Sequence, residues 1–187
     1  MVIGIDEVGR GCWAGPVVAA AVELTEEHPL SRLTDSKKLS AKARTELTVQ
    51  IQESAVQYGI AWVWPREINK IGLTESVRLA MQRAIDELTL DGQAVIIDGN
   101  YNFLPHIKNT STLVKADAII PAVSAASIIA KVARDHYMQE IGRKYPDYGF
   151  EKHVGYGTAQ HITALKQYGV IKTLHRLTYK PIVKFAQ

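Results

Sequence analysis

Two short apolar runs near the start of the chain, separated only by a glycine-rich turn, most constrain its fold. Residues 2–6 and 17–24 have the length and β-branched content of strands. The ten residues between them are too few for a crossover helix, so the two strands must run antiparallel. A purely parallel sheet is therefore excluded, and later strands have to join a mixed sheet.

The remaining apolar patterns predict helices and three further strands. Four-residue spacing predicts a helix capped by Ser40, and an apolar stripe predicts another capped by Thr74. Further strands are predicted at 60–64, 94–99 and 112–115, and helices at about 124–145 and 158–168. The fold class is therefore α/β, a mixed β-sheet flanked by helices. Residues 1–187 are predicted to form one domain, with a mainly helical C-terminal extension at about 146–187.

Composition restricts the compartment and the chemistry. No apolar stretch approaches the roughly 18 residues that a membrane span needs. The N-terminus has no signal-type pattern, so we expect a cytoplasmic protein without a membrane partner. Cys12 is the only cysteine, which excludes an internal disulfide and a cysteine-based zinc site.

Positive charge is concentrated in the second half of the chain. Residues 101–187 contain 12 Lys and Arg against 5 Asp and Glu, whereas residues 1–100 contain 10 against 14. Such an excess favours a polyanionic partner such as nucleic acid. It also fits an unevenly charged solvated surface, so charge alone does not decide between the two.

Acidic residues end two of the predicted strands. Asp6 and Glu7 follow the first strand, Asp98 ends the strand at 94–99, and Asp117 lies just past the next. Carboxylates at neighbouring strand ends repel one another unless a cation lies between them, and oxygen ligands favour Mg²⁺ or Mn²⁺. Asp6 and Glu7 point to opposite faces of a continuing strand, so a shared site requires the strand to end or bend there, as Gly9 permits.

Three loops have features suited to a sugar–phosphate chain. Gly9-Arg10-Gly11 allows close backbone approach, although an ordinary tight turn explains it equally well. Lys37 and Lys38 could pair with phosphate, although a solvated loop is the default. Tyr156 lies between two glycines, where its ring could lie against a sugar or base, although packing tyrosines are commoner.

Taken together, these segments resemble the type 2 ribonuclease H family, specifically its ribonuclease HII branch. The matching segments keep the family's order over residues 3–158: Gly4–Gly11, Asp35–Ser40, Ile97–Asn100, Val114–Asp117, Ser124–Val132, Arg134-Asp135, and Gly155-Tyr156 with Thr158. Each segment alone is weak, whereas the ordered set is highly specific. The resemblance implies a ribonuclease H-like fold.

The resemblance also implies a role for each matching residue. Asp6, Glu7, Asp98 and Asp117 would be the catalytic carboxylates that hold the divalent metals. The segment Gly9, Arg10 and Gly11 would read a ribose 2′-hydroxyl at an RNA–DNA junction, and Tyr156 would pack under the neighbouring deoxyribose. Lys37, with Lys38 beside it, would contact phosphate, and Asp135 would support the site without binding metal.

Two positions depart from the family pattern. Cys12 stands where the family usually has proline, and Val154 stands where it usually has lysine. The first change bears on the stiffness of the glycine loop, and the second removes a basic contact, with Lys152 and His153 nearby. Arg10 argues against ribonuclease HIII, which has Gly-Lys-Gly at this position.

The resemblance implies an endonuclease that cuts RNA in RNA–DNA hybrids and cuts 5′ of ribonucleotides embedded in duplex DNA. Two metal ions would assist hydrolysis, leaving 3′-hydroxyl and 5′-phosphate ends. One alternative is another metal nuclease on a ribonuclease H-like fold. The other is a non-catalytic nucleic-acid-binding protein. No obligate protein partner is expected, and the sequence does not decide between Mg²⁺ and Mn²⁺.

Overall fold

A five-stranded mixed sheet forms the centre of the computed structural model, which describes residues 1–25, 27, 30, 33 and 40–186. The strands lie in the order β3-β2-β1-β4-β5. Their bounds are Val2–Val8 (β1), Val17–Leu24 (β2), Gln57–Val63 (β3), Ala94–Asp98 (β4) and Thr110–Leu113 (β5). β2 runs antiparallel to β1 and β3, whereas β4 runs parallel to β1 and β5. The predicted mixed sheet is confirmed.

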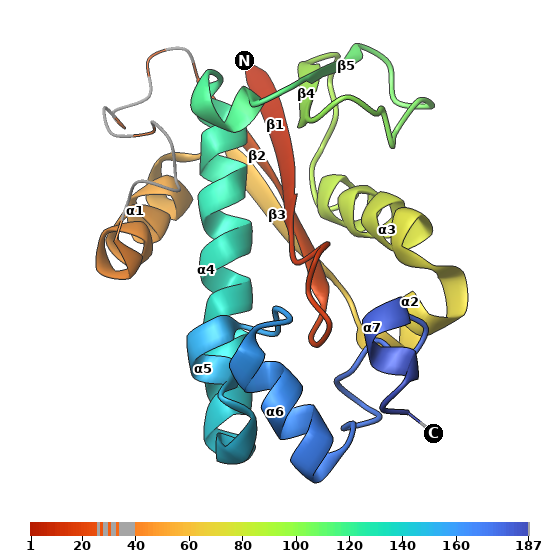
Figure 1. Ribbon diagram of the computed structural model, residues 1–187. Helices are drawn as coiled ribbons and strands as arrows, with labels where there is room; N and C mark the ends of the chain where they lie inside the picture. The colour runs from red at the N-terminus through yellow and green to blue at the C-terminus, as the bar shows by residue number, and fades with distance from the viewer. Residues whose placement is uncertain (26, 28–29, 31–32, 34–39, 187) are drawn as a thin grey trace.

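Helices cover both faces of the sheet (Figure 1). Their bounds are Ala41–Ser54 (α1), Pro65–Ile71 (α2), Leu73–Ile85 (α3) and Pro121–Lys144 (α4). One core joins α3 to the face of the sheet that carries Ile3, Ile5 and Ala19. The other joins α1 and α4 to the face that carries Val18 and Ala20. The alternating buried residues of β2 therefore supply both cores.

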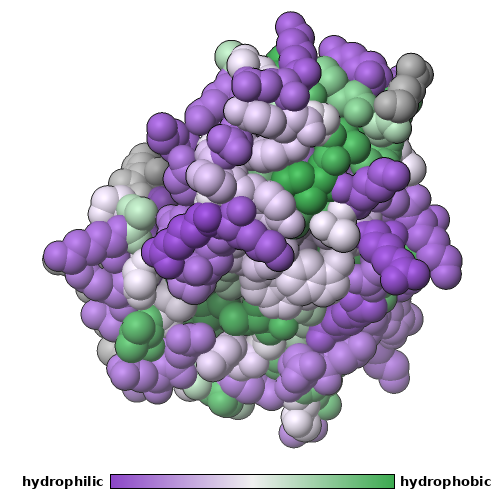
Figure 2. Space-filling view, turned by 90° about the horizontal axis from the view of Figure 1, so that it is seen from below, coloured by the Kyte–Doolittle hydropathy of each residue, from purple (hydrophilic) through white to green (hydrophobic). Residues whose placement is uncertain are grey.

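The last third of the chain is mainly helical, as predicted. Its elements are η3 (Pro146–Tyr148), α5 (Phe150–His153), α6 (Ala159–Tyr168) and α7 (Lys180–Val183). In the view from below, hydrophilic residues cover most of this end of the molecule, and apolar residues show as small patches between them (Figure 2). Among the described helices, none is both long enough and apolar enough to cross a bilayer.

Several boundaries differ from those predicted. Thr74 lies inside α3, because Gly72 occupies the N-cap position instead. Helix α2, with Pro65 at its first position, was not predicted, and α4 begins at Pro121 rather than near Ser124. β5 covers 110–113 rather than 112–115, because Lys115 adopts a left-handed conformation with φ 59° that a strand cannot continue through.

Gly4 sets the distance between β1 and α4. A Cβ added there would lie 2.2 Å from the backbone C of Ala122 and from the backbone N of Val123. A side chain at this position would therefore push α4 away from the sheet. Since α4 also lines the pocket described below, this close contact positions part of the site.

We expect Gly4→Ala to destabilise the protein by about 1–3 kcal/mol or more, because overpacking against backbone cannot be relieved by a rotamer change. Thermal unfolding would measure the loss. Gly11→Ala is the matched control, since its added Cβ would meet only the Tyr156 ring at 3.7 Å. Equal unfolding temperatures for the two variants would contradict the assigned role of Gly4.

Candidate active site

Three carboxylates line one pocket at the point where β1 and β4 stop pairing with each other. The last parallel pair between these strands is Ile5 with Ile97, so Asp6 and Asp98 are the next residues on neighbouring strands. A cavity of about 380 Å³ lies here, and its lining includes Asp6, Glu7 and Asp98. The structure thus brings together three of the four acids that the sequence singled out.

The strand does not end at these acids, which was one of the two conditions that the sequence allowed. β1 continues to Val8, which pairs with Val18 of β2. Alternation therefore places Asp6 and Glu7 on opposite faces of β1. Both reach the pocket because it is β4 that ends, at Asp98, leaving this edge of β1 open.

Burial and mutual repulsion disfavour the charged carboxylates. Burial raises the pKa of Asp6 well above its usual range, and the neighbouring charge of Glu7 adds to the effect. Burial also raises the pKa of Glu7, although the Arg10 guanidinium, 3.2 Å from Glu7 Oε1, opposes this. The charge of Asp98 raises both pKa values further. A cation in the pocket would relieve this repulsion.

The oxygen donors of the pocket fit a hard divalent cation such as Mg²⁺ or Mn²⁺. Within the described part of the chain, however, no three His, Cys, Asp or Glu side chains are grouped closely enough to hold an ion. An ion bound by all three carboxylates would therefore require them to lie closer together than they do here. Without a cation, their mutual repulsion opposes a closer approach.

Asp117 is buried and is not among the residues that line the pocket. It is 4% exposed and belongs to the short helix η2 (Ala116–Ala118). The preceding residue, Ala116, donates its backbone N–H to Asp98 Oδ1 at 2.7 Å. The structure therefore places Asp117 next to a residue that orients Asp98, without bringing it among the pocket-lining acids.

Helix α4 contributes Ser127 and Lys131 to the pocket. Their four-residue spacing places both on one face of the helix, together with Asp135. Asp135 Oδ2 accepts a hydrogen bond from Lys131 Nζ at 2.8 Å. The sequence had not assigned a role to Ser127 or Lys131, although they are polar residues four positions apart in the mainly apolar first half of this helix.

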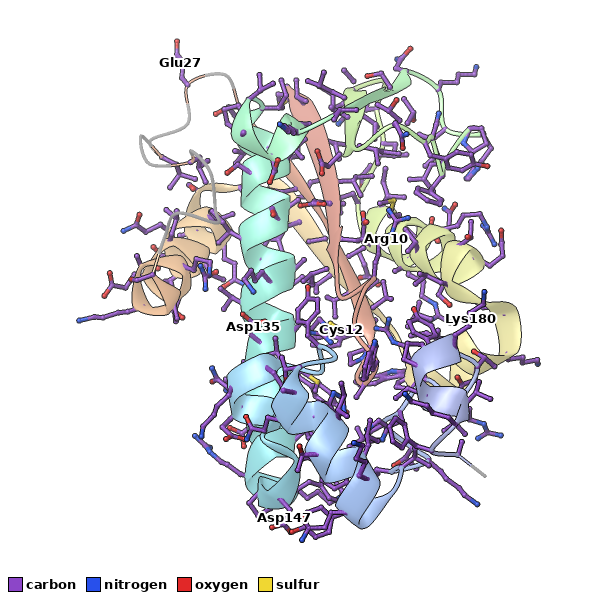
Figure 3. All side chains as sticks on the ribbon, in the orientation of Figure 1. Arg10, Cys12, Glu27, Asp135, Asp147 and Lys180 are labelled. Carbon is purple, nitrogen blue, oxygen red and sulfur yellow. The ribbon has the colours of Figure 1, made fainter. Side chains whose placement is uncertain are left out.

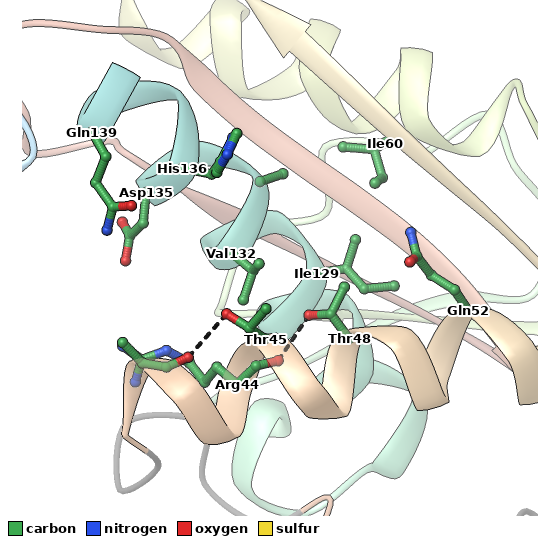
Figure 4. Close-up of a pocket in the computed structure, with 12 residues that line it drawn as sticks. Arg44, Thr45, Thr48, Gln52, Ile60, Ile129, Val132, Asp135, His136 and Gln139 are labelled. Carbon is green, nitrogen blue, oxygen red and sulfur yellow. Dashed lines mark hydrogen bonds between the residues drawn. The ribbon is translucent and has the colours of Figure 1, made fainter. Parts of the chain in front are cut away.

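Asp135 itself lines a second cavity, of about 300 Å³, between α1 and α4 (Figure 4). His136 and Gln139 lie beside it, and Thr45 and Thr48 of α1 face them across the cavity. Both threonine hydroxyls donate within α1, to the carbonyls of Ala41 and Arg44. Asp135 therefore does not line the carboxylate pocket, although its partner Lys131 does.

The predicted glycine loop forms one wall of the carboxylate pocket, through Gly9, Arg10 and Gly11. Figure 3 shows Arg10 and Cys12 on this turn, between α4, which carries Asp135, and α7, which carries Lys180. Gly9 has φ 93°, and an added Cβ would lie 2.5 Å from Arg134 Nε. The loop thus needs glycine there for its conformation and its packing. Lys37 and Lys38 lie outside the described residues.

Tyr156 lies next to Gly11 of this loop in the same pocket, with 45% of its surface exposed. A chain of buried hydrogen bonds leads to its carbonyl. The Ile171 N–H donates to His175 Nδ1 at 2.8 Å, which leaves the proton on His175 Nε2. That nitrogen lies 3.1 Å from His161 Nε2, and His161 Nδ1 lies 2.9 Å from the Tyr156 carbonyl oxygen. Both histidines are therefore neutral: His175 Nε2 donates to His161 Nε2, and His161 Nδ1 donates to the Tyr156 carbonyl, which holds the backbone at Tyr156.

These two histidines should make the stability depend on pH. Burial lowers the pKa of both His161 and His175 to about 4, from about 6.5 in the unfolded chain. The unfolded chain binds more protons between these values, so stability is full above pH 6.5 and falls as the pH drops toward 4. We expect a loss of about 2 kcal/mol for each histidine between pH 7 and pH 5.

Urea unfolding at both pH values would measure this loss. His136→Gln is the matched control, because the side chain of His136 on α4 is 75% exposed. It should leave the pH dependence unchanged, whereas the double variant His161→Gln, His175→Gln should flatten it. An equally steep dependence in that double variant would contradict the assignment.

Arg134 joins α4 to the two turns beside the pocket, a role that the sequence did not reveal. Its guanidinium is fully buried and donates to the carbonyls of Pro16 (2.9 Å), Ala14 (3.1 Å) and Val154 (2.9 Å). Val154 adopts φ 42°, a strained conformation for a β-branched residue. Arg134 therefore stabilises the turn that precedes Tyr156 as well as the turn that follows the glycine loop.

Comparison with known proteins decides which family has this arrangement. The sequence pattern of the family described as Ribonuclease HII matches residues 3–182. The chain belongs to the ribonuclease HII family. It is 47% identical over 183 residues to the ribonuclease HII of Dichelobacter nodosus, covering 97% of this chain and 95% of that one. It is 45% identical over 189 residues to that of Nitratidesulfovibrio vulgaris, covering 96% and 86%.

Solved structures support the same conclusion for the ribonuclease HII fold. The ribonuclease H2 of Pyrococcus horikoshii matches with a TM-score of 0.84 and 28% identity, over 99% of this chain and 96% of that one. The ribonuclease HIII described in complex with Mn²⁺ shares the fold at 19% identity, with a TM-score of 0.71, over 100% of this chain and 70% of that one. The recognised family and the ribonuclease H-like fold are therefore confirmed. The chain is a ribonuclease H, an endonuclease acting on RNA–DNA hybrids.

Proposed function

We propose that this ribonuclease HII cuts 5′ of ribonucleotides embedded in duplex DNA, as well as RNA in hybrids, by metal-assisted hydrolysis. The observation that carries the proposal is the pocket itself. Asp6, Glu7 and Asp98 line it together with the Gly9–Gly11 loop and Tyr156. A cluster of metal-type carboxylates thus shares one cavity with the two segments suited to contact a sugar.

In this proposal the chain's carboxylates hold two divalent ions, Mg²⁺ or Mn²⁺. Bound there, the ions would activate a water for in-line attack on phosphorus and stabilise the leaving 3′ oxygen. Asp6, Glu7 and Asp98 would bind them directly, with Asp117 joining as the carboxylates draw together. The ribonuclease HIII structure with Mn²⁺ is a property of that relative, and it is consistent with this choice of metal.

The remaining pocket residues would bind and orient the nucleic acid. The backbone of Gly9, Arg10 and Gly11 would approach the ribose 2′-hydroxyl, and Tyr156 would pack under the neighbouring deoxyribose. Lys131, held by Asp135, would face the phosphate next to the carboxylates. Lys37 and Lys38 would contact phosphate further along the duplex.

The test is to map the cleavage site on an end-labelled DNA duplex that carries one ribonucleotide. Parallel reactions would contain Mg²⁺, Mn²⁺ or chelator, and an all-DNA duplex and an RNA–DNA hybrid would be run beside them. We expect a metal-dependent nick immediately 5′ of the ribonucleotide, with 3′-hydroxyl and 5′-phosphate ends. Cleavage of the hybrid alone would limit the activity to RNA runs, and cleavage of the all-DNA duplex would indicate a general nuclease.

A further inference from the structure

The C-terminal segment 174–179 packs against the turn that follows the glycine loop. The Gly15 N–H donates to the Leu174 carbonyl at 2.9 Å, and the Arg176 N–H donates to the Trp13 carbonyl at 2.9 Å. Ala14 and His175 also form a β-bridge. Residues more than 150 positions apart in the sequence are thereby joined through their backbones, directly beside the carboxylate pocket.

The Arg176 side chain extends this contact into the glycine loop. Its guanidinium is fully buried, and Nε and Nη2 both donate to the Gly15 carbonyl, at 3.1 and 3.0 Å. Nη1 donates to the Arg10 carbonyl at 3.0 Å and to the Tyr179 hydroxyl at 2.9 Å. The Tyr179 hydroxyl in turn donates to the Arg10 carbonyl at 3.1 Å. Two donors from the C-terminal segment therefore hold one carbonyl of the loop.

Holding this carbonyl fixes the orientation of a peptide plane. No peptide bond in the described chain is cis, so the Arg10 carbonyl and the Gly11 N–H point in opposite directions from their shared plane. The carbonyl points toward Arg176 and Tyr179, so the Gly11 N–H points away from them. Gly11 lines the carboxylate pocket, and a Cβ on it would lie 3.7 Å from the Tyr156 ring.

We propose that Arg176 and Tyr179 are positioning residues that determine specificity for ribose. By holding the Arg10 carbonyl, they orient the Gly11 N–H as a donor to the 2′-hydroxyl of a ribose bound in the pocket that Gly11 and Tyr156 both line. This inference rests on the proposed function, in which the Gly9–Gly11 loop reads the 2′-hydroxyl. It adds two residues from the opposite end of the chain, neither of which touches the nucleic acid.

The test compares binding to two duplexes that differ by one hydroxyl group. Dissociation constants would be measured in Mg²⁺ for a DNA duplex with one ribonucleotide and for the same all-DNA duplex. All proteins would carry Asp98→Asn, so that neither duplex is cut. Tyr179→Phe removes one donor to the Arg10 carbonyl and keeps the ring. Tyr58→Phe on the exposed surface of β3 is the matched control.

We expect Tyr179→Phe to reduce the preference for the ribonucleotide duplex about 3- to 10-fold, the value of one hydrogen bond. Arg176→Lys, which loses the forked geometry, should reduce it further. Affinity for the all-DNA duplex should stay constant in both variants and in Tyr58→Phe. A general loss of structure would instead weaken binding to both duplexes.

Two other results would overturn the inference in different ways. If the Asp98→Asn protein itself bound both duplexes equally, the proposed reading of the 2′-hydroxyl would be wrong, and this inference with it. If that protein preferred the ribonucleotide and both variants kept the full preference, only the positioning role would be wrong. Should Arg176→Lys fail to fold, Tyr179→Phe decides alone, because its ring still packs in place.

Discussion

Replacing Asp98 with Asn is expected to abolish cleavage, lowering kcat by about 10³-fold or more. Asp98 ends β4 beside Asp6 and receives the Ala116 N–H at 2.7 Å, so its position is fixed by the backbone. The amide keeps the shape of the side chain but loses the charge that a divalent ion needs. Steady-state cleavage of an RNA–DNA hybrid in Mg²⁺ would measure the effect.

Asp91→Asn is the matched control, since Asp91 lies in the exposed turn before β4. It should cleave like the unaltered protein. Binding of the hybrid should be retained in both variants, because the phosphate contacts are unchanged or face less repulsion. Cleavage by Asp98→Asn within about tenfold of the unaltered protein would show that Asp98 does not hold a catalytic metal.

The second large effect is expected from Arg134→Met, which should destabilise the protein by about 3–5 kcal/mol. The buried carbonyls of Ala14 and Pro16 and the partly buried carbonyl of Val154 would lose their donor together. The strained turn at Val154 would also lose the hydrogen bond that stabilises it, and the position of Tyr156 would no longer be fixed. Chemical unfolding of the purified protein would measure the change in free energy.

Arg143→Met provides the comparison for this change, because it lies on the same helix with its side chain 77% exposed. It should alter the free energy of unfolding by less than about 1 kcal/mol. If Arg134→Met unfolded at the same urea concentration as Arg143→Met, the two loops would not depend on the buried guanidinium for their stability.

The sequence predicted the strands and the main helices because their signals are local. Alternation and apolar runs identified β1, β2 and β4, and acids at two strand ends indicated the position of the pocket. The predictions that failed, the N-cap of α3 and the missed helix α2, also depended on local sequence signals. A glycine, Gly72, took the cap position that Thr74 was expected to hold, and the helix α2 was too short to show a clear apolar period.

The buried side chains that hold the loops of the pocket in place could not be predicted in the same way. Arg176 contacts Arg10 across 166 positions of sequence, and Arg134 contacts Pro16 across 118. Nothing in the local pattern distinguishes these buried arginines from the exposed Arg143. Likewise, the direction of hydrogen bonding through His161 and His175 depends on which backbone groups meet each ring. Such contacts become visible only once the chain is folded.

The most direct test of the account is the location of Mn²⁺ in a crystal of the protein bound to an RNA–DNA hybrid, found from its anomalous scattering. We predict that Mn²⁺ lies in the pocket where β4 ends beside β1, within coordination distance of Asp6, Glu7 and Asp98, with Asp117 drawn in beside them. A hybrid bound at the Gly9–Gly11 loop with Mn²⁺ only elsewhere on the molecule would contradict it.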